Sequence, residues 1–468
     1  MQLWAQWWWC VQALRPACAR WRTFVGMVLV LVGVSVRSDL AGVTSFVRAV
    51  GLHPKLYRRL LHVFHSDSLD LNTLAKLWCA LALKLFAPVR VNGRIVCLAD
   101  GLKVAKEGKK MPGVKKLHQE SQNNSKPEYI MGHSFQAISL LVSGRAQCLV
   151  AVPLISRIHE GLLWSRKCKR TLLDKMALLF LEVATHLEQP LILVADAYYA
   201  SRKVILPLLK KGHHLVTRLR ITAVAYHRAP KPKKSKRGRP KFYGEKVRLR
   251  DLAKDTAAFI TAASPVYGET EIELAYRCID LLWRPIGRMA RFVIVIHPTR
   301  GMLFLLCSDT AMNPLDIIAL YGYRFKIEVS FRQALHVIGA YGYHFWMKTM
   351  TPIRNNDKGQ KIHNKSPQYR RAIKRKLKAY HVYVQLACIA QGLLQHLALN
   401  CGSCVWRHFR SWLRTMNTHK PPSELVVAYA LRHSLLEFLA GTPDDHKLKK
   451  ILIENMDPNQ VPQLHMVA

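Results

Sequence analysis

The sequence predicts an α/β fold in which strands and helices alternate along the chain. Two short apolar segments each run into an aspartate, residues 94–99 before Asp100 and residues 191–195 before Asp196. A stretch with helical periodicity, about residues 169–187, directly precedes the second segment. Apolar runs of this length are typical of buried strands, and a helix placed between two of them indicates an α/β sheet.

The remaining segments predict helical ends and a β-rich insertion. Short helical patterns fill residues 38–85, and residues 370–399 predict one long helix whose first turns carry arginine and lysine along one face. Asn313-Pro314 provides an N-cap and a first-turn proline for a further helix. We therefore divide the chain into a helical N-terminal region that is a candidate for DNA binding (1–90), the first part of the α/β core (91–216), a β-rich insertion with a basic segment (217–300), the second part of the core (301–345) and a basic helical C-terminal region (346–468).

The charge balance indicates a polyanionic partner. The 468 residues include 71 lysines and arginines but only 29 aspartates and glutamates, which gives a formal net charge of +42. A chain so far from neutrality repels itself unless a polyanion neutralises it. Nucleic acid is the favoured partner, and its binding would weaken steeply with salt. An anionic membrane surface and ribosome-like packing are the alternatives.

Other features of the composition argue against a secreted, a zinc-binding or a membrane-spanning protein. The 11 cysteines have no secreted-domain spacing, so we expect reduced thiols, including Cys401 and Cys404. The 21 histidines show no zinc-site spacing. Residues 24–36 form a 13-residue run without a charge, whereas a membrane helix needs about 20 residues. We expect a buried helix there, with membrane insertion as the alternative.

Three acidic residues can form a metal centre. Asp100 and Asp196 each end an apolar strand, at the sheet edge where α/β folds bind ligands. Glu328 lies on a predicted helix, and Tyr321 and Arg324 precede it at offsets that place them on the same face. Two aspartates and a glutamate can together hold two Mg²⁺ ions for in-line phosphoryl transfer, because Mg²⁺ prefers oxygen ligands.

The segment around Glu328 resembles a known family. "YGYRFKIE" reproduces the Tyr-x-x-Arg-x-x-x-Glu part of the Y-R-E-K signature of bacterial insertion-sequence DDE transposases, and "LADGLKVAKEGKK" and "VADAYYAS" resemble the family's two aspartate segments. The resemblance implies an RNase H-like catalytic core interrupted by the β-rich insertion. It also implies that Asp100, Asp196 and Glu328 bind Mg²⁺ or Mn²⁺ and catalyse the reaction, while Tyr321 and Arg324 contact DNA.

The same resemblance implies partners and a location. The partners are double-stranded DNA, as terminal inverted repeats and as target, and a second copy of the chain when two ends are paired. The location is the bacterial cytoplasm, on the nucleoid when the protein is bound to DNA, without a membrane. One signature position differs, because Leu335 stands where the family has a lysine. Lys326, Arg332 and His336 are the nearby residues that can replace its contact with DNA.

Further candidate DNA-binding residues lie outside the signature. The segment after Asp100 carries Lys103, Lys106, Lys109 and Lys110, which we expect to bind phosphates. Trp283 in the insertion either stacks on a base or belongs to the core. "RGRPK" at residues 237–241 resembles a minor-groove hook, with simple attraction to the DNA backbone as the alternative.

These features favour one function and leave two alternatives open. The favoured function is a DDE transposase that cleaves transposon ends and joins them to target DNA with a two-metal site. A metal-dependent nuclease on the same fold would cut DNA without joining it. A non-enzymatic basic protein, bound to nucleic acid or membrane, would use its acids only for structure.

Overall fold

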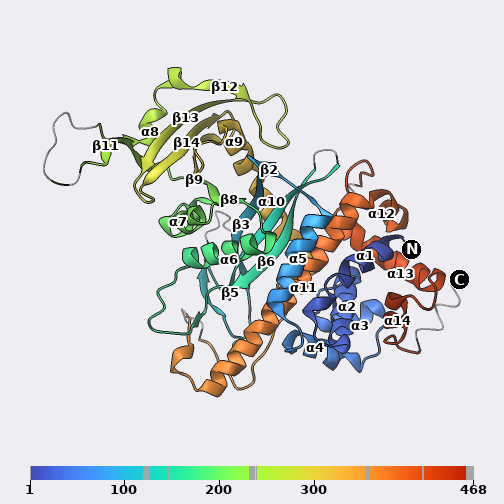
Figure 1. Ribbon diagram of the computed structural model, residues 1–468. Helices are drawn as coiled ribbons and strands as arrows, with labels where there is room; N and C mark the ends of the chain where they lie inside the picture. The colour runs from blue at the N-terminus through green and yellow to red at the C-terminus, as the bar shows by residue number, and fades with distance from the viewer. Residues whose placement is uncertain are drawn as a thin grey trace. The chain divides into compact units, whose positions relative to one another are not determined.

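The computed structural model describes residues 2–119, 127–145, 148–230, 238, 240–354, 359–413 and 416–459, and the chain forms two compact units (Figure 1). The first unit consists of Met1–Pro88, Gly101–Lys169 and Glu328–Ala468, and the second of Val89–Asp100 and Arg170–Ile327. The chain therefore passes between the units four times, after Pro88, Asp100, Lys169 and Ile327. Each unit contains parts of several of the five segments expected from the sequence. The division into five segments therefore stays a prediction.

The N-terminal part of the first unit is helical, as its sequence predicts. The apolar run at residues 24–36 forms a buried helix, which confirms that expectation. Asp70 caps the last helix of the group, because its carboxylate accepts the Thr73 N–H at 2.7 Å. The helices are α1 (Gln2–Gln12), α2 (Trp21–Val36), α3 (Val43–Val50), α4 (Leu56–His65) and α5 (Leu71–Leu85), with a 3₁₀ turn at Arg15–Ala17.

The C-terminal part of the first unit surrounds one long helix, α11 (Pro367–Asn400), which confirms the predicted C-terminal helix. Among the described residues, α11 alone is long and apolar enough to cross a membrane, but 94% of its apolar window is buried inside the protein. Burial of this kind is typical of a core helix. The shorter helices that follow are α12 (Gly402–Phe409), α13 (Glu424–Gly441) and α14 (Lys447–Ile453).

Strand β6 (Leu149–Ile158) of the first unit is an edge strand that α5 and α11 cover. Among the described strands it pairs only with β5 (Tyr129–Ser143). Trp78 of α5 donates to the Pro153 carbonyl at 2.8 Å, and Gln385 of α11 donates to the Leu154 carbonyl at 2.8 Å. These side chains satisfy backbone groups that an edge strand leaves open. The unit's other strands are β1 (Ala87–Pro88), β4 (Lys115–His118), β7 (Leu162–Leu163) and β16 (Gln360–Lys361), with a 3₁₀ turn at Ile362–Asn364.

A parallel ladder forms the centre of the second unit. Strand β3 (Arg94–Ala105) pairs in parallel with β8 (Leu191–Ala195), and β8 pairs in parallel with β9 (His214–Arg218). Helix α6 (Leu172–Leu187) begins with a capping box between Thr171 and Asp174, as helix starts often do. The remaining elements here are β2 (Arg90–Val91), a 3₁₀ turn at Ala197–Tyr199 and α7 (Arg202–Lys210).

The predicted β-rich insertion is present and rejoins this ladder. Strand β15 (Gly301–Cys307) pairs antiparallel with β9, as expected from the sequence. Asn313 caps α9 (Pro314–Tyr323) by accepting the Leu315 N–H at 2.9 Å. The insertion's elements are β10 (Val224–Arg228), β11 (Tyr243–Arg248), α8 (Leu249–Leu252), a 3₁₀ turn at Thr256–Ala258, β12 (Ile260–Ala263), β13 (Glu273–Trp283) and β14 (Arg288–His297).

Two local expectations are wrong. Strand β3 does not stop at Asp100 but continues to Ala105, because its outer half pairs with β5. The helix of the signature segment is not continuous either. It is interrupted at Arg324, between α9 and α10 (Phe325–Gln333), and it ends in a π-helical turn at Ala334–Ile338.

Lys106 is a buried lysine that joins two segments of the first unit. Only 3% of its surface is exposed, and its ammonium donates to the carbonyls of Tyr341 and Tyr343. Burial lowers its pKa from 10.5 to about 8. Nearby, the Met347 N–H donates to the Lys110 carbonyl at 3.0 Å. The segment after Asp100 is therefore fastened to the chain that follows the π-helical turn.

The packing of α5 against α11 predicts the effect of a single methyl group. A Cβ on Gly392 would overlap the indole ring of Trp78, which is fully buried. We expect Gly392→Ala to lower the free energy of unfolding by about 1–3 kcal/mol, as overpacking does. Urea denaturation measures this loss. Gly402→Ala is the matched control, because its nearest neighbour lies at 3.7 Å; equal stability of the two variants would contradict the packing argument.

The pKa of Lys106 predicts a pH dependence of stability. Between about pH 8 and 10.5 the unfolded chain holds a proton on Lys106 that the folded chain has lost, so the contribution of Lys106 to the free energy of unfolding rises with pH. In Lys106→Met this contribution is absent. We expect the wild-type free energy of unfolding, minus that of the variant, to increase by about 3 kcal/mol from pH 7 to pH 11. Urea denaturation across this range provides the measurement, and a constant difference would contradict it.

Candidate active site

Asp100 and Asp196 lie side by side on neighbouring parallel strands of the second unit. In the ladder Ala99 pairs with Ala195, so each aspartate is the residue that follows this last pair along the chain. Neighbouring strands lie about 4.8 Å apart. Both aspartates are partly buried. The pairing of β3 with β8 therefore brings together two acids that are 96 positions apart, as the residue numbers show.

Arg324 is the ion-pair partner of Asp100. Its guanidinium Nη1 lies 3.0 Å from Asp100 Oδ2, and 20% of each side chain is exposed. Arg324 is also the residue at which the signature helix is interrupted between α9 and α10. The end of α9 is thus joined to the strand that carries the first aspartate. A guanidinium that binds a carboxylate in this way also has the geometry for a phosphate.

Tyr321 and Arg218 complete this cluster. Burial raises the pKa of the Tyr321 hydroxyl, Arg324 and Arg218 oppose that increase, and Asp196 adds to it. These influences place all of the groups within electrostatic range of one another. Arg218 was not among the residues expected from the sequence. It ends β9, the third parallel strand, where Thr217 Oγ1 donates to the Asp196 carbonyl at 2.8 Å.

Glu328 belongs to the first unit and is exposed on α10. Two residues later, the carbonyl and hydroxyl of Ser330 accept from the buried Gln391 Nε2 at 3.0 and 3.2 Å. Leu335, at the position of the signature lysine, is partly buried in the π-helical turn, and His336 next to it is exposed. Arg332 is exposed one turn after Glu328.

The donor atoms at Asp100 and Asp196 suit a hard divalent ion. Carboxylate oxygens are the ligands of Mg²⁺ and Mn²⁺, whereas zinc sites usually contain cysteine or histidine. Among the described residues, no three aspartate, glutamate, histidine or cysteine side chains are gathered closely enough to hold one metal ion. The two aspartates therefore fit such an ion as a pair of ligands. The role of Glu328 as a third ligand stays a prediction.

The other predicted DNA-binding residues have different environments. Lys103 and Lys109 are exposed, and Lys110 is partly exposed. The ammonium of Lys326 lies 3.8 Å from the ring centroid of Tyr267. Lys106 is buried and its ammonium is bound to backbone carbonyls, which does not fit the phosphate contact expected of it. Trp283 is only 5% exposed, which favours the core, one of the two roles expected from the sequence.

Within "RGRPK", Arg237 and Arg239 lie outside the described residues. All 11 cysteines have free thiols, as expected.

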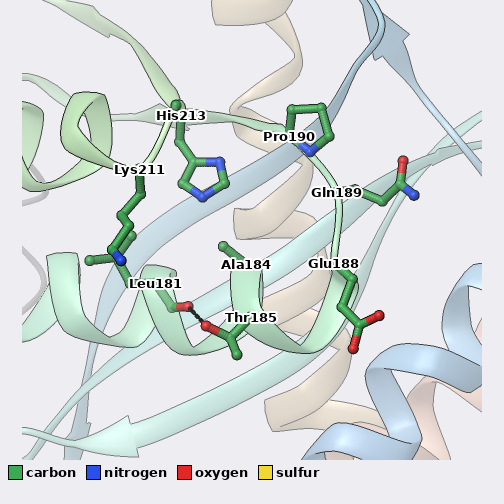
Figure 2. A pocket seen from close by; sticks show the side chains of 9 residues that line it. Leu181, Ala184, Thr185, Glu188, Gln189, Pro190, Lys211 and His213 are labelled. Carbon is green, nitrogen blue, oxygen red and sulfur yellow. Dashed lines mark hydrogen bonds between the residues drawn. The ribbon is translucent and has the colours of Figure 1, made fainter.

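A pocket of about 460 Å³ opens at the other end of the parallel strands (Figure 2). Glu188 and Gln189 line one side of it, and Lys211 and His213 line the other. His213 accepts the Leu191 N–H at 3.2 Å, at the beginning of β8. Asp196 follows the opposite end of the same strand, so the pocket is separate from the aspartate cluster.

Comparison with known proteins identifies the family. Residues 24–264 match the family model described as DDE superfamily endonuclease. This range contains Asp100, Asp196 and Arg218 but ends before Tyr321, Arg324 and Glu328, so the Y-R-E-K subtype is not part of the match. A search of curated proteins finds no match. Because the model covers more than half of the chain and both clustered aspartates, the chain belongs to the DDE superfamily endonuclease family, whose members act on DNA with divalent metal ions.

Proposed function

We propose that the protein is a DDE transposase, which cleaves DNA at the ends of a mobile element and joins those ends to target DNA. The observation that carries the proposal is the cluster of Asp100 and Asp196 with Tyr321 and Arg324 in one compact unit. The Tyr-x-x-Arg-x-x-x-Glu segment supplies two of these residues. The net charge of +42 supports a polyanionic substrate.

Each residue of the cluster has a role in this function. Asp100, Asp196 and Glu328 would hold two Mg²⁺ or Mn²⁺ ions, which supply charge stabilisation and activation of the attacking oxygen. Arg324 and Arg218 bind the phosphate groups on either side of the cut, and Tyr321 donates a hydrogen bond to one of them. The lysines at positions 103, 109 and 110, together with Lys326 and Arg332, contact the DNA backbone further away.

Two displacements at phosphorus follow one another at this site. In the first, water attacks, the P–O3′ bond at the transposon end breaks, and the 3′ oxygen leaves with a proton as a hydroxyl. In the second, that 3′-hydroxyl attacks a target phosphate, whose own P–O3′ bond breaks, and the proton lost by the attacking hydroxyl is balanced by one taken up by the leaving 3′ oxygen. The protein's contribution is to position the reactants and stabilise the charge. Pairing two ends calls for a homodimer, and the substrate places the protein on DNA in the bacterial cytoplasm.

Substitution of the acids tests the mechanism. We expect Asp100→Asn, Asp196→Asn and Glu328→Gln each to lower Mg²⁺-dependent DNA cleavage by about a thousandfold, the equivalent of roughly 4 kcal/mol. DNA binding without metal should stay close to that of the wild type. The substrate is a duplex that contains the sequences flanking the gene, where inverted repeats are expected. Cleavage is measured on denaturing gels.

Asp445→Ala is the control for this series, because Asp445 is an exposed acid outside the cluster. Full cleavage by any of the three active-site variants would refute the assignment of that residue. A second assay supplies precut ends and target plasmid to the wild type. Joined products support the transposase, whereas cleavage with a consistent absence of joining identifies a nuclease on the same fold.

A further inference from the structure

Helix α4 in the first unit presents a stripe of basic side chains. Its apolar residues Leu56, Leu60, Val63 and Phe64 are buried. Residues three and four positions apart lie on the same side of a helix. The exposed cationic side chains and one histidine follow this spacing along the opposite side, beside the exposed Tyr57, and they are Lys55, Arg58, Arg59 and His62. No acidic residue occurs within α4.

The first half of α11 presents a second stripe of the same kind. Ile373 and Tyr380 are buried, while arginine and lysine at spacings of one, three and four positions are exposed. The exposed residues are Arg370, Arg371, Lys374 and Arg375. The whole of α11 contains no acidic residue. Among the described residues, none of the cations in the two stripes forms an ion pair with a carboxylate.

The two stripes adjoin one another, as the neighbouring positions of α4 and α11 in Figure 1 indicate. The Lys376 ammonium lies 3.5 Å from His65 Nε2 at the end of α4, and Lys378 donates to the Ser66 carbonyl at 3.1 Å. Burial, followed by the charges of Lys376 and Arg375, lowers the pKa of His65 to about 4. Asp67 pairs with Lys378, but the Asp67 side chain is 96% exposed, so it neutralises little of this charge.

We infer that α4 and the first half of α11 form a second DNA-binding surface, which holds the backbone of duplex DNA without reading its sequence. Seven permanent cations without acidic partners repel one another, and a row of phosphates removes that repulsion. Arginine and lysine on the outer side of a helix fit phosphates, and contacts with phosphates carry no sequence information.

The chemistry of the surface distinguishes DNA from a membrane as its partner. A helix that lies on a membrane inserts an apolar side into the lipid. The apolar side of α4 is already buried in the protein. The inference rests on the proposed function only for the choice of DNA as the polyanion. Binding that ignores sequence suits target DNA or DNA outside the element's ends.

Neutral substitutions test this surface in the full-length protein. The variants are Arg58→Gln/Arg59→Gln in α4 and Arg371→Gln/Arg375→Gln in α11, because all four side chains are exposed. Binding to several unrelated 30-base-pair duplexes is measured in EDTA at increasing salt. For each pair we expect at least about tenfold weaker binding on every duplex, and a salt slope that is smaller by about two.

Lys210→Gln/Lys211→Gln is the matched control, because both lysines are exposed at the end of α7 in the other unit. It should keep the wild-type slope, and thermal melting should show that all variants fold. An unchanged slope in the α4 and α11 pairs would overturn the inference, as would weaker binding on one duplex sequence only. Loss of binding to anionic vesicles with unchanged DNA binding would instead identify a membrane surface.

The outcome is separable from that of the proposed function, because binding is measured without metal. If Asp100→Asn cleaves normally while the stripe variants lose DNA affinity, the proposed chemistry fails and this surface stands. If Asp100→Asn is inactive while the stripe variants bind like the wild type, this surface fails and the proposed chemistry stands.

Discussion

The parallel pairing of β3 with β8 is the constraint on which the active-site cluster depends. Two parallel strands present their carboxyl ends on the same edge of a sheet. The residues that directly follow the last β3–β8 pair, Ala99 with Ala195, are therefore neighbours. Asp100 and Asp196 occupy those two positions. Parallel strands need cover on both faces, and the apolar residues of β8 are fully buried. The core thus fixes the two acids before any ligand is bound.

Two neighbouring carboxylates repel each other, and arginine side chains of the protein offset this repulsion. Like charges at short range raise the free energy of the folded state. Arg324 binds Asp100 directly, and Arg218 stands at the end of the adjoining strand β9. Asp196 gains a further partner in the Tyr198 N–H. Two guanidinium groups therefore accompany the two carboxylates. Because a guanidinium binds carboxylate and phosphate with the same geometry, the residues that balance the acids can also hold DNA.

Much of this site could be predicted from the sequence, and the exceptions have physical causes. Asp196 follows an apolar strand that ends where the apolar run ends. Asp100 lies inside a longer strand, because pairing with β5 extends β3 beyond the apolar run, and no local pattern indicates that partner. Lys106 was expected to be exposed, yet the carbonyls that bury it come from residues more than 230 positions later. Arg218 was missed because arginines at strand ends are common. Only the parallel pairing of β9 with β8 shows that Arg218 lies at the same edge of the sheet as Asp196.

Helix α11 connects the edge of the first unit's sheet with the helix that carries Glu328. The buried side-chain amides of α11 have two kinds of partner. Gln385 and Gln395 donate to backbone carbonyls of β6. Gln391 donates to Ser330, which lies two residues after Glu328. Gln395 also donates to Glu424 at 3.0 Å, a carboxyl whose pKa is raised by burial. Each of these buried groups would cost about 1–3 kcal/mol if left without a partner, so α11 cannot shift relative to β6 without losing several at once. The orientation of α10, and with it that of Glu328 within the first unit, is consequently set by the same helix that closes the edge of the sheet.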